Sequence, residues 1–584
     1  MKKLIVQVVA VAAALTSSAV TYPVTKGDVT TLTNLLATYT SQSTVIELEA
    51  GDYDLTGIEM KAGSHLYQQH VTIRGKGATP WETRLIGDGT KRVVANLGYD
   101  GIPATIDNLT LTNGYTTSSG GGLSGYLKIN NSIIIGCKAA NGGAAEGSMS
   151  ATNCKFINNT ATVDGGALYR PSGAVDCDFI GNTAAGSGGA VYSYDKQGSL
   201  RGCLITNNVA GGSGGGVFYG GLVTNCIIVC NKATTGDGGG LYLASGKSTS
   251  DCPVRKSVIA GNYAGGDGGG AYHRDLYDCE VHDNYSLNHG GGLYTGVARH
   301  CIISNNITGV SSSGDSYLES HGWQSDNTFR TGLEYCDISG SSPKSGYGLG
   351  CTVHDVMKKF TLVGNPHAGE VSKTCSIVWA GSGALTNCLV VNNGPGVATT
   401  GVSLTLFRGS IRSIVNCTIV NNWVTKTFHY ADSTSNPVVM ENCILYSNKF
   451  AHYGNVIDLS EESWGTPTCK AGGVIFKNTS YGAVNAPFAD ANGGMSPEGI
   501  APGYNAYRYG YNGIGANPLF DSASAYPYSL AKRSTLRKKG VVEDWMANAN
   551  DIRGAGYPRV FEEKVDLGCY QSQFVTLGMT LLLR

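Results

Sequence analysis

Apolar and polar positions recur along this chain in blocks of 22 to 31 residues. Each block opens with a cysteine or a similar small residue, continues as a short alternating run, and reaches an asparagine five positions later. Alternation with a period of two is typical of a strand that buries one face. The opening residues are Cys154, Cys177, Cys203, Cys226, Ser257, Cys279 and Cys301, and the asparagines are Asn159, Asn182, Asn208, Asn231, Asn262, Asn284 and Asn306. A repeat of this length predicts a solenoid.

A glycine-rich block follows each asparagine. Gly165-Gly166-Ala167-Leu168-Tyr169 is one example, and related blocks stand at 188–192, 214–218, 238–242, 268–272 and 290–294. Each repeat therefore consists of a strand, an asparagine turn, a glycine-rich turn, a second strand, a loop and a third strand. Since no repeat has room for a helix of ten residues, we predict an all-β fold, a single-stranded parallel β-helix whose coils stack about 4.8 Å apart.

This stacking predicts the role of the asparagines and cysteines. An inward asparagine at a bend can bond to its neighbours in the coils on either side, which satisfies its buried amide. The cysteines are interpreted as a stacked apolar ladder of thiols, because an unpaired cysteine behaves as a small hydrophobe. Disulfides between coils are the alternative. A zinc site is less favoured, since the repeat contains no CxxC pair.

The two ends of the chain depart from the repeat. Residues 1–19 combine a basic start, an apolar run and a small-residue site, which predicts a secretory signal peptide with cleavage near Ala19, a short anchor helix being the alternative. Apolar spacing behind Asp28 predicts an N-terminal capping helix over residues 28–39. We therefore expect a β-helix with its N-terminal cap over residues 20–470, and irregular last coils with a C-terminal cap over residues 471–584. The protein is expected to be secreted or displayed at the cell surface.

Composition supports this interpretation. The chain has 584 residues, 83 of them glycine, and a net charge of −1. That glycine content disfavours a helical bundle, and the corners of the coils account for much of it. The near-neutral charge argues against a nucleic-acid partner, and no later segment is long enough for a membrane span.

Two columns of residues are candidates for binding. One precedes the glycines and contains Asp164, Asp237 and Asp267, with Ser187, Ser213 and His289 between or beyond them. Three carboxylates along one edge predict a candidate Ca²⁺ site, the only cofactor considered, while Asx-turn hydrogen bonding is the alternative. The other column is aromatic and is expected to face outward as a ligand-binding stripe, unless a bend or loop buries it. It comprises Tyr169, Tyr192, Phe218, Tyr242, Tyr272 and Tyr294.

Two family resemblances follow from shorter motifs. Residues 156–159 with 165–168, and 179–182 with 188–191, resemble the paired FxxN and GGA[ILV] repeats of chlamydial polymorphic outer membrane proteins. Residues 46–53 and the closing Asp566-Leu567-Gly568-Cys569-Tyr570 resemble secreted bacterial right-handed parallel β-helix proteins of the pectin-lyase-like superfamily. The second resemblance implies a right-handed helix. The pectate-lyase and polygalacturonase catalytic motifs of that superfamily are missing from the sequence.

Two functions remain open at this point. A non-catalytic adhesion or carbohydrate-binding scaffold needs only the repeat, and its partner would be a polysaccharide or a host or cell-surface component. A polysaccharide lyase or glycoside hydrolase acting on a uronate-containing polysaccharide needs a charged cluster that interrupts the repeat. Histidines gather at His273, His282, His289 and His300, but the aligned coils place His282 and His300 on different faces. We therefore favour the scaffold.

Overall fold

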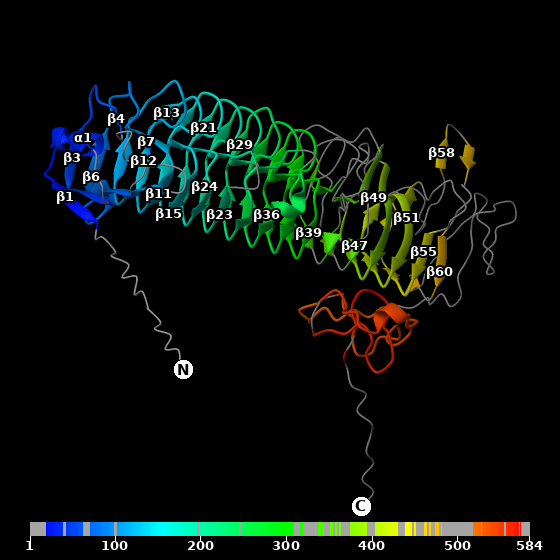
Figure 1. Ribbon diagram of the computed structural model, residues 1–584. Coiled ribbons are helices and arrows are strands. Elements are labelled where there is room, and N and C mark those ends of the chain that lie inside the picture. Colours follow the sequence, from blue (N-terminus) through cyan, green and yellow to red (C-terminus); the bar gives the residue numbers. More distant parts are fainter. Residues whose placement is uncertain are drawn as a thin grey trace, which may run out of the picture.

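The computed structural model is a right-handed parallel β-helix, seen from the side in Figure 1. It describes residues 19–308 with gaps at 39–42, 62–69, 99–101, 195–197 and 245–246, then strand segments between 316 and 481, and residues 518–573 except 527, 554–555 and 572. The predicted fold class is confirmed. The predicted signal peptide and the boundary at 470 lie outside the described residues.

One coil shows how the repeat folds. After the buried Cys154 come β16 (Lys155–Ile157), a turn at Asn158 and Asn159, and β17 (Thr160–Ala161). The glycine corner leads into β18 (Leu168–Tyr169), and β19 (Gly173–Val175) returns the chain to Cys177. Each coil therefore supplies strands to three stacks, here named sheet A, sheet B and sheet C.

Strands of successive coils pair in parallel and in register. Sheet B contains β3 (Gly51–Asp54), β6 (Thr83–Ile86), β9 (Thr110–Thr112), β12 (Ile133–Ile135), β16, β20 (Asp178–Ile180), β24 (Leu204–Thr206), β28 (Ile227–Val229), β32 (Val258–Ala260), β36 (Glu280–His282), β40 (Ile302–Ser304), β44 (Asp337–Ser339), β48 (Thr361–Val363), β50 (Leu389–Val391), β52 (Thr418–Val420), β56 (Ile444–Tyr446) and β61 (Ser480–Tyr481). Sheet C contains β13 (Lys138–Ala139), β17, β21 (Thr183–Ala184), β25 (Val209–Ala210), β29 (Lys232–Ala233), β33 (Tyr263–Ala264), β37 (Tyr285–Ser286), β41 (Ile307–Thr308) and β45 (Ser342–Pro343).

Sheet A receives two strands from most coils. Its first row includes β10 (Leu123–Gly125), β14 (Ala145–Glu146), β18, β22 (Val191–Tyr192), β26 (Val217–Phe218), β30 (Leu241–Tyr242), β34 (Ala271–Tyr272), β38 (Leu293–Tyr294), β42 (Ser316–Leu318), β46 (Cys351–Val353), β49 (Thr374–Thr386) and β51 (Ser403–Val415). Its second row includes β11 (Leu127–Asn130), β15 (Met149–Thr152), β19, β23 (Ser199–Arg201), β27 (Val223–Thr224), β31 (Val254–Arg255), β35 (Leu276–Tyr277), β39 (Ala298–Arg299), β43 (Leu333–Glu334) and β47 (Met357–Lys358).

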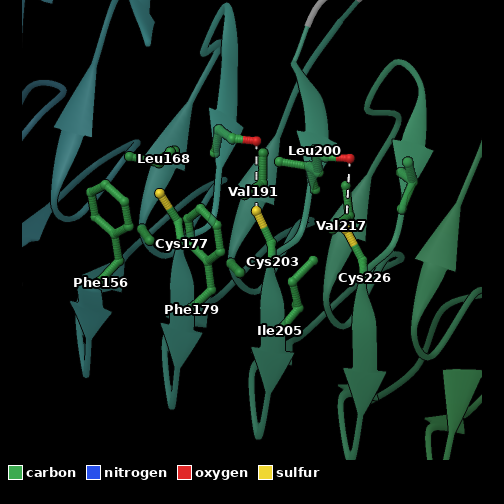
Figure 2. Close-up of a cluster of buried hydrophobic side chains, with 14 of the residues drawn as sticks. Phe156, Leu168, Cys177, Phe179, Val191, Leu200, Cys203, Ile205, Val217 and Cys226 are labelled. Carbon is green, nitrogen blue, oxygen red and sulfur yellow. Dashed lines mark hydrogen bonds between the residues drawn. The ribbon is translucent and has the colours of Figure 1, made fainter. Parts of the chain in front are cut away.

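The core is a set of ladders that run along the helix axis. Figure 2 shows Phe156 and Phe179 side by side, with ring centroids 5.0 Å apart, beside Cys177, Cys203 and Cys226. These cysteines are buried thiols, and Sγ of Cys226 donates to the carbonyl of Leu200 at 3.6 Å. The predicted apolar cysteine ladder is therefore confirmed here, where the structure shows thiols instead of disulfides.

The asparagine ladder is also confirmed. The side-chain Nδ2 of Asn208 donates to Phe179 O at 2.9 Å and to Asn231 Oδ1 at 2.9 Å, while its Oδ1 accepts from both the backbone N and the Nδ2 of Asn182. All four hydrogen-bonding positions of the buried amide are thus satisfied. Its neighbours in the ladder are buried in the same way.

The N-terminal end is closed by a helix, as predicted. Helix α1 (Val29–Ala37) begins behind Asp28, whose side chain accepts from the N–H of Thr31 at 2.9 Å. Leu32 and Leu36 are buried in the same core as the first coils. The helix thereby covers apolar surface that an open solenoid end would expose. Hydrogen bonds from Thr31 lower the pKa of the Asp28 carboxyl.

Residues 518–571 lie against the outer side of sheet B in the last coils (Figure 1, orange to red). Ile552, Cys569 and Tyr570 pack on outward residues of β50 and β52, and Leu530, Leu536 and Leu567 pack on Ile444 of β56. The side chain of Asn442 exchanges two 2.8 Å hydrogen bonds with the backbone of Val541. The described part of the C-terminal region therefore covers a flank of the solenoid.

Candidate functional site

The six predicted aromatic residues form one continuous column on sheet A. Strand register places them opposite one another from β18 to β38. The ring centroids of consecutive members are 5.5, 4.6, 4.9, 5.0 and 5.3 Å apart, with angles between the ring planes of 5–26°. We call Tyr169, Tyr192, Phe218, Tyr242, Tyr272 and Tyr294 the aromatic column.

The aromatic column faces outward, but it is less exposed than strict alternation suggests. Leu168 and the other residues preceding the rings are buried in the core, so the rings stand on the opposite side of the sheet. Tyr192 and Tyr294 are nonetheless buried, and the other four are half-buried. The rings cover each other's faces, and Tyr194 packs edge-on against Tyr169 and Tyr192. What the column offers to solvent is therefore ring edges and hydroxyl groups.

The hydroxyl groups of Tyr169, Tyr192 and Tyr242 stay protonated well above neutral pH. Burial, together with the neighbouring Tyr272 and Asp237, raises the pKa of Tyr242 to about 12. Burial likewise raises the pKa of Tyr169 and Tyr192. Each neutral phenol can donate one hydrogen bond and accept another, which suits ligands rich in hydroxyl groups.

The predicted acidic residues belong to a ladder of hydrogen bonds at the glycine corner. The backbone N of Ser187 donates to Asp164 Oδ1 at 2.7 Å, that of Asp267 to Asp237 Oδ1 at 2.8 Å, and that of His289 to Asp267 Oδ1 at 3.0 Å. The His289 ring also contacts Asp267 Oδ1 through Nδ1 at 2.8 Å. These bonds join successive coils and so differ from the local Asx turns that were the alternative to a metal site, although they also engage the carboxylates with backbone N–H groups.

The three carboxylates are only partly brought together. Asp237 and Asp267 lie on adjacent coils, whereas Ser187 and Ser213 separate Asp164 from Asp237 along the same ladder. Within the described residues, no three histidine, cysteine, aspartate or glutamate side chains are grouped so that they could hold a metal ion. Calcium binding at this ladder stays a prediction.

Substitution of Asp237 can separate its role as a hydrogen-bond acceptor in the ladder from a role as a calcium ligand. Asp237→Asn should not lower stability, because an amide oxygen still accepts from the Asp267 N–H, and Asp237→Ala should lose about 1 kcal/mol with that bond. Thermal denaturation with and without calcium measures both. A calcium-dependent gain in the melting temperature that Asp237→Asn abolishes would show that the carboxylate binds the ion.

The unfolding free energy of the wild type is also expected to depend on pH through Asp237. Burial raises the pKa of the Asp237 carboxyl above 3.8. A group that binds its proton more tightly in the folded state lowers stability as the pH rises. The wild-type unfolding free energy should therefore fall between about pH 4 and neutrality by an amount that Asp237→Asn removes. Equal pH profiles for the two proteins would contradict this.

A second outward column on sheet A was missed in the sequence analysis. Register places Arg201, Thr224, Arg255, Tyr277 and Arg299 opposite one another across β23 to β39, and we call these residues the arginine column. The three arginines are exposed, and the guanidinium carbon of Arg255 lies 4.3 Å from the centre of the Tyr277 ring. Each member stands two positions before the cysteine or serine that opens the next repeat, and aligning that position would have revealed the column.

The histidines are placed in separate environments, as the aligned coils indicated. His282 pairs with Asp283 on sheet B, with Nδ1 and Oδ2 2.7 Å apart. His273 contacts Thr295 Oγ1 at 3.0 Å and the Lys247 carbonyl at 3.2 Å, at a corner of sheet A. Beside it, Arg274 is fully buried and donates to the Cys252 carbonyl at 2.8 Å, an arrangement that packs a corner loop.

Comparison with known proteins assigns no function to the chain. No family model matches the chain, and no curated protein matches it. One solved structure that it resembles is a PL6 family alginate lyase, AlyGC, with 10% sequence identity, 79% of this chain and 85% of that chain covered, and a TM-score of 0.25. None of the helices in the described part of the chain has the length and apolarity needed to cross a membrane.

Proposed function

We propose that this protein is an exported, non-catalytic scaffold that binds an acidic polysaccharide along the outer side of sheet A. Its place of action is outside the cytoplasm, in solution or at a cell surface. Its partner is a polysaccharide, free or as part of a host or other cell surface, with no role for nucleic acid or a membrane span.

The observation that carries the proposal is the pair of parallel columns on one sheet. The aromatic column and the arginine column both run along the helix axis, one residue per coil. Tyr294 and Arg299 stand in the same coil only five residues apart, which limits their separation to about 17 Å. An extended polymer lying along the axis can contact both columns in coil after coil.

The chemistry of the columns suits a charged sugar chain. Phenol hydroxyls and ring edges provide hydrogen bonds and apolar contact for sugar hydroxyls and C–H groups. Guanidinium groups bind carboxylate or sulfate groups in two-pronged geometry. Arg201, Arg255 and Arg299 alternate with uncharged Thr224 and Tyr277, so their charges recur every second coil, roughly 10 Å apart.

Arginine removal tests the proposal. Arg201→Ser and Arg255→Ser should each weaken binding to a soluble polyuronate about 5-fold, equivalent to about 1 kcal/mol, and less at high salt. Titration calorimetry at two salt concentrations measures the effect. Arg84→Ser is the matched control, because Arg84 is equally charged but lies on sheet B, paired with Asp52 at 2.6 Å. Equal losses from all three variants would contradict a specific arginine column.

A further inference from the structure

The outer side of sheet B carries apolar residues in six consecutive strands, from β12 to β32, with Lys155, Asp178 and Thr206 at the remaining outward positions. In each of these strands the middle residue points into the core, as the buried Phe156, Phe179 and Ile228 show, so the flanking residues point outward. We call the outward apolar residues of these strands the apolar face. They are Ile135, Ile157, Ile180, Leu204, Ile227, Val229 and Val258, all at least partly exposed, whereas Ile133 and Ala260 of the same strands are buried. A continuous apolar surface is typical of an interaction site, whereas scattered apolar residues are not.

In later coils, the outer side of sheet B is covered by another part of the chain. Register connects the column of Ile227 and Ile302 with Leu389 and Ile444. Leu389 and Ile444 are 3% and 1% exposed, because residues 518–571 pack on them, whereas Ile227 and Ile302 are 49% and 50% exposed. The outer side of sheet B is thus already an interface in the last coils, and Glu280, Asp337 and Thr361 stand in the same register column between that interface and the apolar face.

We propose that a second copy of this chain covers the apolar face, sheet B against sheet B, with the two solenoids antiparallel. Closed two-fold contacts are the commonest arrangement of identical chains, and stacked sheets bury outward residues of this kind. A two-fold axis parallel to the strands and midway between Leu204 and Ile227 pairs those two residues across the interface.

Charge complementarity supports this arrangement. The symmetry that pairs Leu204 with Ile227 also places Lys155 of one copy opposite Glu280 of the other, since each lies two strands from the central pair. Both side chains are exposed, and Lys155 already forms an ion pair with Asp178 of its own chain. A parallel arrangement would instead place Lys155 beside Lys155 and Glu280 beside Glu280, which repel.

The dimensions indicate a weak dimer. Eight strands spaced about 4.8 Å apart and three residues long cover roughly 400 Å² of each copy, below the roughly 800 Å² of a standard stable interface. We therefore expect association in the micromolar range. Sedimentation velocity over a concentration series should show a monomer converting to a dimer, and a monomer at every concentration up to about 100 µM overturns the proposal.

Zero-length cross-linking tests the orientation. Within one chain, Lys155 and Glu280 are five coils apart, about 24 Å, too far for a direct amide bond. Carbodiimide treatment of the full chain should yield a Lys155–Glu280 cross-linked peptide only in the dimer fraction. The intrachain Lys155–Asp178 link serves as the positive control. A dimer without the Lys155–Glu280 link overturns the proposed packing.

Two substitutions test the apolar face itself. Ile227→Asp should weaken the dimer at least 10-fold, while Val163→Asp should leave it unchanged, because Val163 is comparably exposed (47%) but lies in the turn after sheet C. Glu280→Lys should also weaken the dimer without placing a charge on the apolar face. Circular dichroism confirms that each variant is folded. If the dissociation constant of the dimer is unchanged in both Ile227→Asp and Glu280→Lys, the proposal is overturned.

Discussion

Replacing Asn208 with alanine is expected to lower the local unfolding free energy by about 4 kcal/mol. The substitution deletes four side-chain hydrogen bonds of 2.9 Å within a fully buried ladder. Each buried polar group left without a partner costs about 1–3 kcal/mol, and the Asn182 N–H, which donates to Asn208 Oδ1, is such a group. Removal of the side chain also leaves a small cavity in a close-packed interior.

Hydrogen exchange is the appropriate measurement, because a long solenoid need not unfold in a single step. The amide of Asn182 donates directly to Asn208 Oδ1 and should exchange about 1,000-fold faster in Asn208→Ala. Asn207→Gly is the matched control: Asn207 is exposed and has a φ of 56°, which glycine adopts without strain. The control should change stability by less than about 0.5 kcal/mol. Equal protection of the Asn182 amide from exchange in both variants would show that the asparagine ladder contributes little to stability.

Replacing Gly189 with alanine is expected to cost about 3 kcal/mol or more. A Cβ at this position would come within 3.0 Å of the Gly215 carbonyl oxygen and of the backbone of Val209 in the next coil. Backbone atoms held in a parallel ladder cannot move aside as a flexible side chain would, so the coils must separate locally. The corner glycines therefore set how closely successive coils approach.

Gly136→Ala separates this steric effect from backbone strain. Gly136 has a φ of 66°, but a Cβ there meets nothing within 4 Å. Its substitution should cost only the strain of a left-handed alanine, about 1 kcal/mol. Urea unfolding of the two variants gives the comparison. A larger loss in Gly136→Ala than in Gly189→Ala would contradict close coil approach as the role of the corner glycines.

Features that repeat along the chain could be predicted from the sequence. The buried asparagines, the cysteine ladder and the aromatic column each occupy one fixed position in successive repeats, and stacking converts a sequence period into a spatial column. The exposure of the aromatic column was predicted less well. Alternation gives the side of the sheet on which Tyr192 lies, but it does not reveal that flanking rings and Tyr194 cover it.

Features without such a period could not be predicted. The position of residues 518–571 depends on contacts between parts of the chain about 100 to 160 residues apart, such as Asn442 with Val541 and Asn392 with Tyr528, and no pattern links those segments in the sequence. The arginine column does occupy a fixed position in the repeat, but only Arg201, Arg255 and Arg299 among its five members are charged, so its charge pattern stands out much less than the cysteines or asparagines do.

The most direct test of the proposed function combines binding and cleavage in one measurement. The full chain is mixed with a uronate-containing polysaccharide, with and without calcium, and size-exclusion chromatography with light scattering follows both the complex and the polymer length. We expect the polysaccharide to elute with the protein at unchanged chain length in both conditions. Shortening of the polymer, in either condition, would contradict a non-catalytic scaffold and establish a lyase or hydrolase instead.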